Sequence, residues 1–144
     1  MNNRFQTYKK VNVQTTNRGK IVVMLYSGAI TFLKKAIKAS ENNNFYDKGR
    51  FINKTQDIID ELNYSLDMEK GKEISKNLRS IYIFLTKYLS QANIKNDPEM
   101  IKKVIDILES LKTAFEEIIT NPKYEEAQKI NKREQTQHSI RRFV

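Results

Sequence analysis

Apolar residues recur every three or four positions along this chain, in four long segments separated by polar breaks. This spacing matches the turn of an α-helix and fits the strict alternation of a strand poorly. The segments cover about residues 18–40, 46–66, 72–93 and 98–120. Because they are similar in length and their connections are short, they predict an all-α fold, an antiparallel up-down four-helix bundle.

Polar residues with capping or turn chemistry mark the ends of the segments. Asn17 is a predicted N-cap of the first helix, and the asparagines at 42–44 end it. Lys70-Gly71 predicts the turn before the third helix. Asp97 is the predicted N-cap of the fourth helix, with Pro98 at the first helical position, where its missing N–H costs nothing.

These boundaries divide the chain into three parts. We expect residues 1–16 to form a flexible N-terminal arm or cap and residues 17–120 to form the bundle. Residues 121–144 form a polar C-terminal tail, which we expect to be partly ordered or to add a helix.

The third segment carries more apolar residues than a four-helix core needs. Its expected core face consists of Ile74, Leu78, Ile81, Tyr82, Leu85, Tyr88, Leu89 and Ala92. Ile83 and Phe84 lie off that face and make the middle of the helix apolar nearly all round. Two interpretations stay open, namely packing or self-association of the bundle and a groove for a partner segment.

Composition narrows the class of protein. The chain has 144 residues, of which 39% are hydrophobic and 30% are charged, too apolar for general disorder and too polar for an integral membrane protein. The N-terminus lacks the apolar run of a secretory signal, so we expect a cytoplasmic protein without membrane insertion. With no cysteine and a single histidine, His138, thiolate chemistry and a two-histidine metal site within one chain are excluded.

The net charge of +9 is concentrated at the two ends of the chain. Residues 1–20 carry five basic groups and no acid, and residues 121–144 carry six basic groups and three acidic groups. The central hundred residues are close to neutral. A general basic bias is therefore favoured over a dedicated phosphate-binding surface.

The chain does not carry the patterns of an enzyme or a cofactor-binding protein. The glutamates fall on or near polar faces, the four glycines are scattered, and no histidine of the bundle could activate a serine. Tyr26, Tyr82 and Tyr88 are predicted as core residues with the hydroxyl at the rim. We expect no catalytic residues, no metal and no cofactor.

Several segments, read in order, resemble the flagellar secretion chaperone family (FliS). The similarity begins with YKKVNV at residues 8–13 and IVVMLYSGAI at residues 21–30. It is stronger in IIDELNYSLD at residues 58–67, followed by Gly71 and by LSQAN at residues 89–93. Because the series keeps its order over nearly the whole chain, it is fairly specific.

The resemblance implies a non-enzymatic export chaperone. Such a protein would bind the disordered C-terminal region of flagellin, block premature polymerisation and deliver the subunit to the flagellar type III export apparatus. Further partners would be the export gate and a co-chaperone. We expect a monomer or weak homodimer that does not bind nucleic acid.

Two sets of residues follow from the resemblance together with the helical faces. The N-terminal cap residues Tyr8, Val11 and Val13 would cover an apolar groove in the free protein, although an arm that completes the core or is disordered stays open. The expected client-binding residues are Ile52, Ile59, Leu62, Tyr82, Ile83, Phe84, Leu85 and Leu89.

Two other classes of function stay open. A small basic nucleic-acid-binding bundle would use its charged arms to contact phosphates, and its affinity would fall steeply with salt. A structural bundle that only self-associates would need no client.

Overall fold

The computed structural model describes residues 18–123, which form four α-helices and, within that range, no strand. The helices are α2 (Arg18–Glu41), α3 (Phe45–Tyr64), α4 (Met68–Lys95) and α5 (Pro98–Thr120). The predicted all-α four-helix fold is confirmed. The predicted arm, the Asn17 cap and residues 124–144 of the predicted tail lie outside the described residues.

The described residues belong to two compact units. Residues 24–112 form one unit, which holds most of all four helices. Segments 18–23 and 113–123 belong to the other. In that second unit, α5 ends at Thr120, and the side chain of Asn121 accepts a hydrogen bond from the backbone N–H of Lys123 at 3.0 Å.

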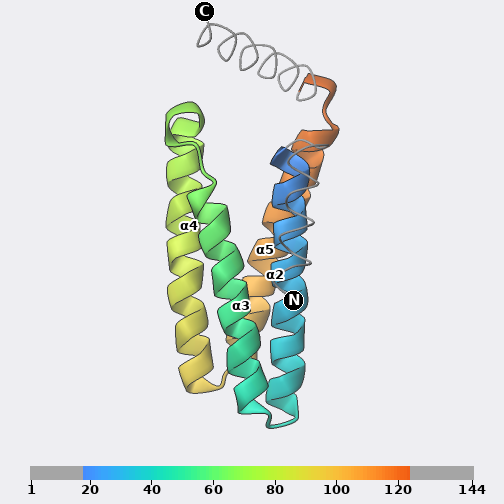
Figure 1. The fold of residues 1–144 in the computed structure, drawn as a ribbon, viewed down its shortest axis with the longest axis vertical. Helices are drawn as coiled ribbons and strands as arrows, with labels where there is room; N and C mark the ends of the chain where they lie inside the picture. The colour runs from blue at the N-terminus through green and yellow to red at the C-terminus, as the bar shows by residue number, and fades with distance from the viewer. Residues whose placement is uncertain (1–17, 124–144) are drawn as a thin grey trace, which may run out of the picture. The chain divides into compact units, whose positions relative to one another are not determined.

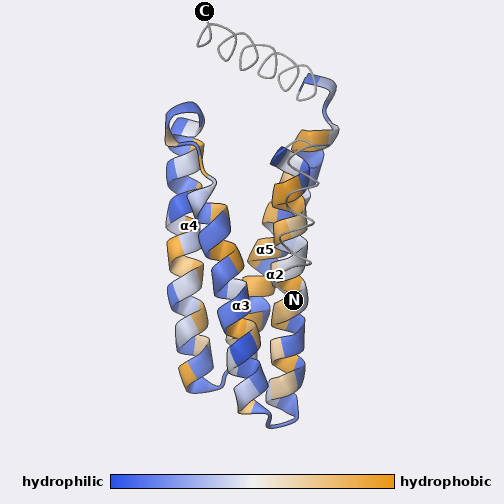
Figure 2. Cartoon of the chain, in the orientation of Figure 1, coloured by the Kyte–Doolittle hydropathy of each residue, from blue (hydrophilic) through white to orange (hydrophobic). Residues whose placement is uncertain are grey.

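Within residues 24–112, consecutive helices run in opposite directions (Figure 1). Hydrophobic and hydrophilic residues alternate around every helix, so none of the four is apolar on all sides (Figure 2). The interior is built from aliphatic side chains and two tyrosines. Its largest fully buried members are Tyr26, Leu33, Ile52, Thr55, Ile59, Leu62, Tyr82, Leu85, Leu89, Ile101, Val104 and Leu108.

Side-chain caps begin three of the helices. The side chain of Asn44 accepts a hydrogen bond from the backbone N–H of Asp47 at 3.1 Å, and Asp67 caps the start of α4 in the same way. The side chain of Asp97 accepts from the N–H of Glu99 at 3.0 Å, so the predicted cap ahead of Pro98 is confirmed. Each contact satisfies an N–H that has no partner within its helix.

The start of α4 differs from the prediction. Asp67 caps a first helical turn that begins at Met68, so α4 consists of two helices joined at residue 72, where the predicted helix begins. Lys72 has φ 44° and ψ −118°, so the helix is kinked there. Gly71 leaves room at this kink, since a Cβ at that position would lie 2.9 Å from the Cβ of Ser75.

Candidate functional site

Six of the eight predicted client-binding residues lie in the interior of the unit of residues 24–112. Each of their side chains is at most 2% exposed. These residues are Ile52, Ile59, Leu62, Tyr82, Leu85 and Leu89. They therefore hold α3 and α4 in place beneath any surface that a partner could contact.

Ile83 and Phe84 are exposed, as their position off the core face predicted, with exposed fractions of 44% and 53%. They do not share a surface. Neighbouring residues of an α-helix point about 100° apart, so Ile83 and Phe84 lie on different sides of the buried face formed by Tyr82, Leu85 and Leu89. Sequence reasoning placed both outside the core but did not separate them.

The flank of α4 that carries Ile83 faces α3. The side-chain amide of Gln56 in α3 donates to the backbone carbonyl of Thr86 at 2.9 Å and to the hydroxyl of Ser90 at 2.8 Å. Ile83, Thr86 and Ser90 follow one another at helical spacing. This flank is therefore tied to α3 by polar contacts.

The opposite flank of α4 is apolar. We call Ile74, Ile81, Phe84 and Tyr88 the apolar strip, since they follow one another along the helix at intervals of seven, three and four residues. The rings of Phe84 and Tyr88 stack with centroids 5.3 Å apart. Ile74, predicted as a core residue, is 70% exposed. That prediction was wrong.

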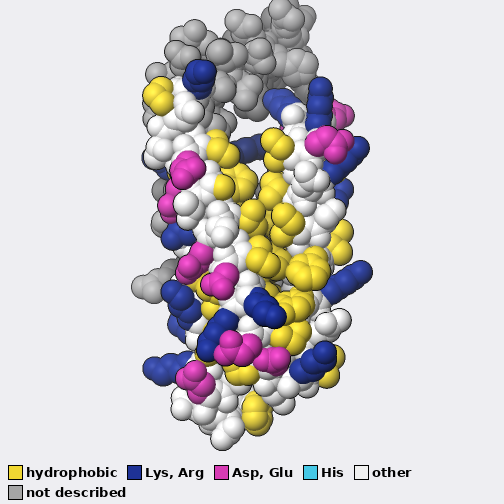
Figure 3. Space-filling model, turned by 180° about the vertical axis from the view of Figure 1, so that it is seen from behind, with side chains coloured by type: hydrophobic (Ala, Val, Ile, Leu, Met, Phe, Trp, Pro, Cys, Tyr) yellow, Lys and Arg dark blue, Asp and Glu magenta, His cyan; other side chains and the backbone are white. Residues whose placement is uncertain are grey.

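Helix α5 adds apolar side chains beside the strip. Glu109 of α5 pairs with Lys34 of α2 at 3.9 Å, which identifies the flank of α5 that faces α2. The half-buried Ile107 and Leu111 lie on its other flank. Figure 3 shows hydrophobic side chains running between α4 and α5, with charged side chains beside them.

A pair of tyrosines links α2 to α4 beneath this surface. The hydroxyls of Tyr26 and Tyr82 form a hydrogen bond, and the two side chains are 0% and 2% exposed. The prediction that these hydroxyls lie at the rim was wrong, because each serves as the other's partner in the interior. Tyr88, by contrast, is half-buried.

Burial changes the acid–base chemistry of this pair. It raises the pKa of Tyr26 far above its usual value, and the charge and hydrogen bond of Tyr82 raise it further. Burial also raises the pKa of Tyr82, although its hydrogen bond to Tyr26 lowers that pKa in part. Both phenols therefore stay protonated, so the pair serves as a structural hydrogen bond.

Lys48 is buried although it is charged, with 2% exposure. Its ammonium donates to the backbone carbonyl of Asn93 at 3.0 Å and to the side-chain oxygen of Asn96, and it lies 5.1 Å from the ring centroid of Phe45. Burial lowers the pKa of Lys48. Sequence reasoning missed this link between α3 and the end of α4, although Lys48 is four residues before the core residue Ile52.

A cluster of aromatic and basic side chains joins α2 to α3. The rings of Phe32 and Phe51 stack 6.1 Å apart. The charged groups of Lys35 and Lys54 lie 5.9 and 5.3 Å from the centroid of Phe32, and that of Arg50 lies 4.7 Å from the centroid of Phe51. The cations thus cover rings that are only half-buried.

The described residues carry no grouping suited to a bound metal. Within residues 18–123, no three histidine, cysteine, aspartate or glutamate side chains come together as metal ligands would. The predicted cap residues Tyr8, Val11 and Val13, and His138, lie outside this range.

No helix within residues 18–123 is both long enough and apolar enough to cross a bilayer.

Comparison with known proteins gives consistent similarities. The family described as Flagellar protein FliS matches residues 1–122. The Flagellar secretion chaperone FliS of Vibrio cholerae is 40% identical over 122 residues, covering 82% of this chain and 90% of that protein. The Flagellar secretion chaperone FliS of Bacillus subtilis is 32% identical over 117 residues, covering 81% and 86%.

A solved structure shares the fold. A crystal structure of a flagellar chaperone from bacteria superposes with a TM-score of 0.70 at 16% sequence identity. The match covers 82% of this chain and 98% of that one. The four-helix arrangement is thus shared with a protein of distant sequence.

Proposed function

We propose, from the premise that this chain belongs to the FliS family of flagellar secretion chaperones, that its client is flagellin. It would bind the disordered C-terminal region of flagellin in the cytoplasm, prevent premature polymerisation and deliver the subunit to the type III export apparatus. In this proposal the protein is not an enzyme. It works by binding alone, with the export gate and a co-chaperone as further partners.

The apolar strip on α4 is the observation that supports this proposal most directly. Ile74 and Phe84 are 70% and 53% exposed, and Phe84 stacks on the half-buried Tyr88. Apolar residues at helical spacing along one flank suit a client segment that folds into an amphipathic helix as it docks. Coupled folding and binding of this kind typically buries roughly 1,000 to 3,000 Å².

We assign different roles to the eight predicted client-binding residues. Phe84 lies at the centre of the apolar strip and would contact the client most extensively. Ile83 would contribute less, because it lies away from the apolar strip, on the flank where Thr86 and Ser90 contact α3. The six buried residues would act indirectly, by holding α3 and α4 in position.

The N-terminal cap remains part of the proposal. Tyr8, Val11 and Val13 would cover the client surface in the free protein and leave it when flagellin binds. Hydrogen exchange on the full chain, with and without the flagellin segment, tests this displacement. Equal protection of residues 1–16 in both states would rule it out.

Calorimetric titration with the C-terminal segment of the same organism's flagellin, at low and high salt, tests the client. We expect a one-to-one complex with a negative heat-capacity change and little dependence on salt, since apolar burial dominates. A parallel titration with duplex DNA tests the alternative. Binding whose affinity falls with salt, at a log-log slope of about −0.9 per phosphate contact, would support a nucleic-acid-binding function instead. Absence of binding to the flagellin segment would reject the proposal.

Substitutions at two neighbouring residues of α4 test whether the apolar strip is the client-binding surface. Phe84→Ser should weaken flagellin binding by about tenfold or more, since a buried aromatic contact contributes at least about 1.4 kcal/mol. Ile83→Ser is the matched control, because it removes an exposed apolar side chain from the other flank and should change the affinity little. Equal effects of the two substitutions would remove the apolar strip from the client surface.

A further inference from the structure

The aromatic and basic side chains that join α2 to α3 have no role in the client proposal. We call them the aromatic–basic cluster, which consists of Phe32, Lys35, Arg50, Phe51 and Lys54. All five belong to the unit of residues 24–112. The cluster is built on α2 and α3, whereas the apolar strip is built on α4. The two surfaces therefore use different helices.

The two stacked rings hold the three cations of the cluster in place. The ammonium of Lys35 lies 5.9 Å from the centroid of Phe32 and 5.8 Å from that of Phe51, so it contacts both rings. Lys35 and Arg50 are exposed, and exposed lysine and arginine side chains ordinarily lose much rotational freedom when they bind an anion. Attraction to the rings restrains these side chains beforehand, which reduces that loss.

The sequence on both sides of the cluster is basic. Residues 32–38 of α2 contain three lysines and no acid, and residues 48–54 of α3 contain two lysines, one arginine and no acid. One of these lysines, Lys34, pairs with Glu109 of α5 at 3.9 Å. The three cations of the cluster are instead gathered around one pair of rings, which concentrates positive charge at one place on the surface.

We propose that the aromatic–basic cluster is a docking site for a short acidic segment of a partner protein. Carboxylates of this segment accept hydrogen bonds from Lys35, Arg50 and Lys54. Such charge-assisted hydrogen bonds are shorter and stronger than those between neutral groups. Because the three cations surround a single pair of rings, two or three carboxylates close together in the partner can reach them all.

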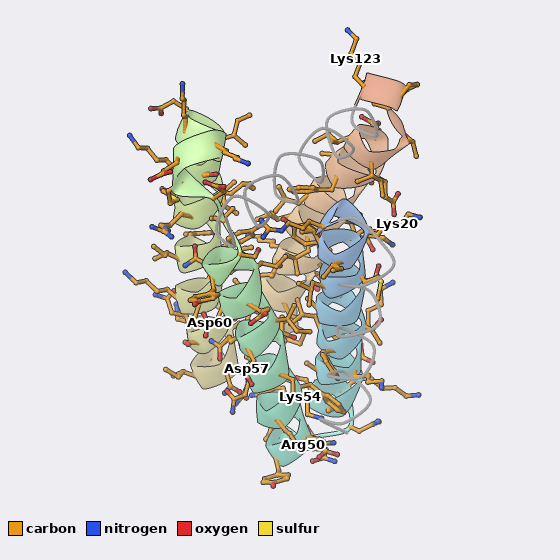
Figure 4. All side chains as sticks on the ribbon, turned by 45° about the horizontal axis from the view of Figure 1, so that its top comes forward. Lys20, Arg50, Lys54, Asp57, Asp60 and Lys123 are labelled. Carbon is orange, nitrogen blue, oxygen red and sulfur yellow. The ribbon has the colours of Figure 1, made fainter. Side chains whose placement is uncertain are left out.

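The neighbouring charges on α3 favour a short acidic segment over a nucleic acid. Arg50 and Lys54 lie one helical turn apart on this helix. Asp57 and Asp60 follow further along it (Figure 4). A nucleic-acid strand carries charge at regular intervals, so a strand that continued along α3 would meet these two carboxylates. A short acidic segment that ends at the cluster avoids this repulsion.

The ion pair already present in the cluster is easily exchanged. Arg50 and Asp47 lie 3.5 Å apart, and their side chains are 43% and 36% exposed. Exposed pairs of this kind contribute little to stability, so Arg50 can turn to another carboxylate with little loss. Residues 1–20 of the chain contain five basic groups and no acid. The N-terminal part of this chain therefore does not supply the carboxylates.

Titration of the full chain with a synthetic peptide, followed by NMR, is the first measurement. Glutamate and alanine alternate in the probe peptide, and glutamine replaces every glutamate in the control peptide. We expect saturable binding of the acidic peptide only, weaker at high salt, with chemical-shift changes centred on residues 32–35 and 50–54. Shift changes centred elsewhere, or no binding at low salt, overturn the proposal.

Neutral substitutions test the cations. Lys35→Gln/Arg50→Gln should weaken binding of the acidic peptide by about tenfold or more, because two charge-assisted contacts are lost. The matched control Lys87→Gln/Lys103→Gln removes two exposed charges from α4 and α5 and should stay within about twofold of the parent chain. Equal weakening by the two double variants would show an effect of net charge alone and would reject the site.

Substitutions that keep size or charge test the role of the rings. Phe51→Leu retains an apolar side chain but removes the ring that Lys35 and Arg50 contact, so it should weaken binding by about threefold. Lys35→Arg should bind as the parent chain does, since arginine also stacks on aromatic rings. Unchanged binding by Phe51→Leu, with the variant folded by circular dichroism, contradicts the proposed arrangement.

Titration with duplex DNA separates a protein partner from a nucleic acid. We expect any DNA binding to fall equally in Lys35→Gln/Arg50→Gln and in the Lys87→Gln/Lys103→Gln control, because it would reflect net charge. A selective loss in the cluster variant would assign the cluster to phosphate contacts and reject an acidic protein segment. None of these titrations contains flagellin, so their outcome is independent of the proposed client.

Discussion

The two flanks of α4 have opposite chemistry on one helix. On the flank beside α3, Gln56 bonds to Thr86 and Ser90, and Arg79 donates to the side-chain oxygen of Asn63 at 3.4 Å. On the other flank, the apolar strip carries stacked rings and exposed isoleucine. The comparison teaches that polar, directional contacts identify the neighbouring helix, while the proposed client surface lies on the apolar flank.

The largest loss of stability is expected from a substitution in the buried face of α4, which lies between its two flanks. Leu85 is fully buried, so Leu85→Ala removes apolar contacts and leaves a cavity. We expect the free energy of unfolding to fall by about 2 to 5 kcal/mol. Urea denaturation measures this change, and a loss below about 1 kcal/mol would show that the core around α4 is loosely packed.

The buried tyrosine pair should have the next largest effect. Tyr26→Phe leaves the buried Tyr82 hydroxyl without this hydrogen bond and should cost about 1 to 3 kcal/mol. The double variant Tyr26→Phe/Tyr82→Phe should cost less than the sum of the single changes, because neither hydroxyl of the pair is then left without the other. Additive costs in denaturant titrations would mean that the hydroxyls do not interact.

Because of this buried tyrosine pair, we expect the free energy of unfolding to depend on pH in the alkaline range. Burial raises both pKa values, so the folded chain keeps protons that the unfolded chain releases above its ordinary tyrosine pKa of about 10. The stabilisation is complete below that pH and is lost as the pH rises further. The unfolding free energy of the double phenylalanine variant should therefore fall less steeply between about pH 9 and 11.

Substitutions on the flank of α4 beside α3 should change the free energy of unfolding less. One should lower it and the other should leave it unchanged or raise it. Gln56→Ala removes the hydrogen bonds to α4 and should cost about 1 kcal/mol. Within residues 18–123, the buried hydroxyl of Thr86 has no hydrogen-bond partner, so Thr86→Val should be neutral or stabilising by up to about 1 kcal/mol. Thermal denaturation compares both variants, and destabilisation by Thr86→Val would indicate an unseen contact.

The smallest effect on stability is expected on the apolar flank. Phe84 is half-exposed, so Phe84→Ser should change the unfolding free energy by less than about 1 kcal/mol. Its effect on flagellin binding should be much larger. A variant that lost stability and binding in proportion would show that the apolar strip belongs to the core rather than to a client surface.

The sequence predicts part of the difference between the two flanks of α4. The spacing of apolar residues indicated the four helices and placed Ile83 and Phe84 outside the core. It also placed Ile74 in the core, because a helical period alone does not tell which flank receives a neighbour. The buried Lys48 was missed, since charge argued for solvent while its acceptors, Asn93 and Asn96, lie far away in sequence.

The sequence by itself determined the helices, their caps and the inward side of each, because hydrogen bonding and periodicity act over a few residues. The ordered series of sequence motifs also indicated the resemblance to the FliS family. Only the tertiary structure decided which helix lies beside each flank of α4, and hence that Ile83, although exposed, lies on the flank beside α3. The choice of neighbour depends on contacts between residues distant in sequence, such as Gln56 with Ser90 and Tyr26 with Tyr82.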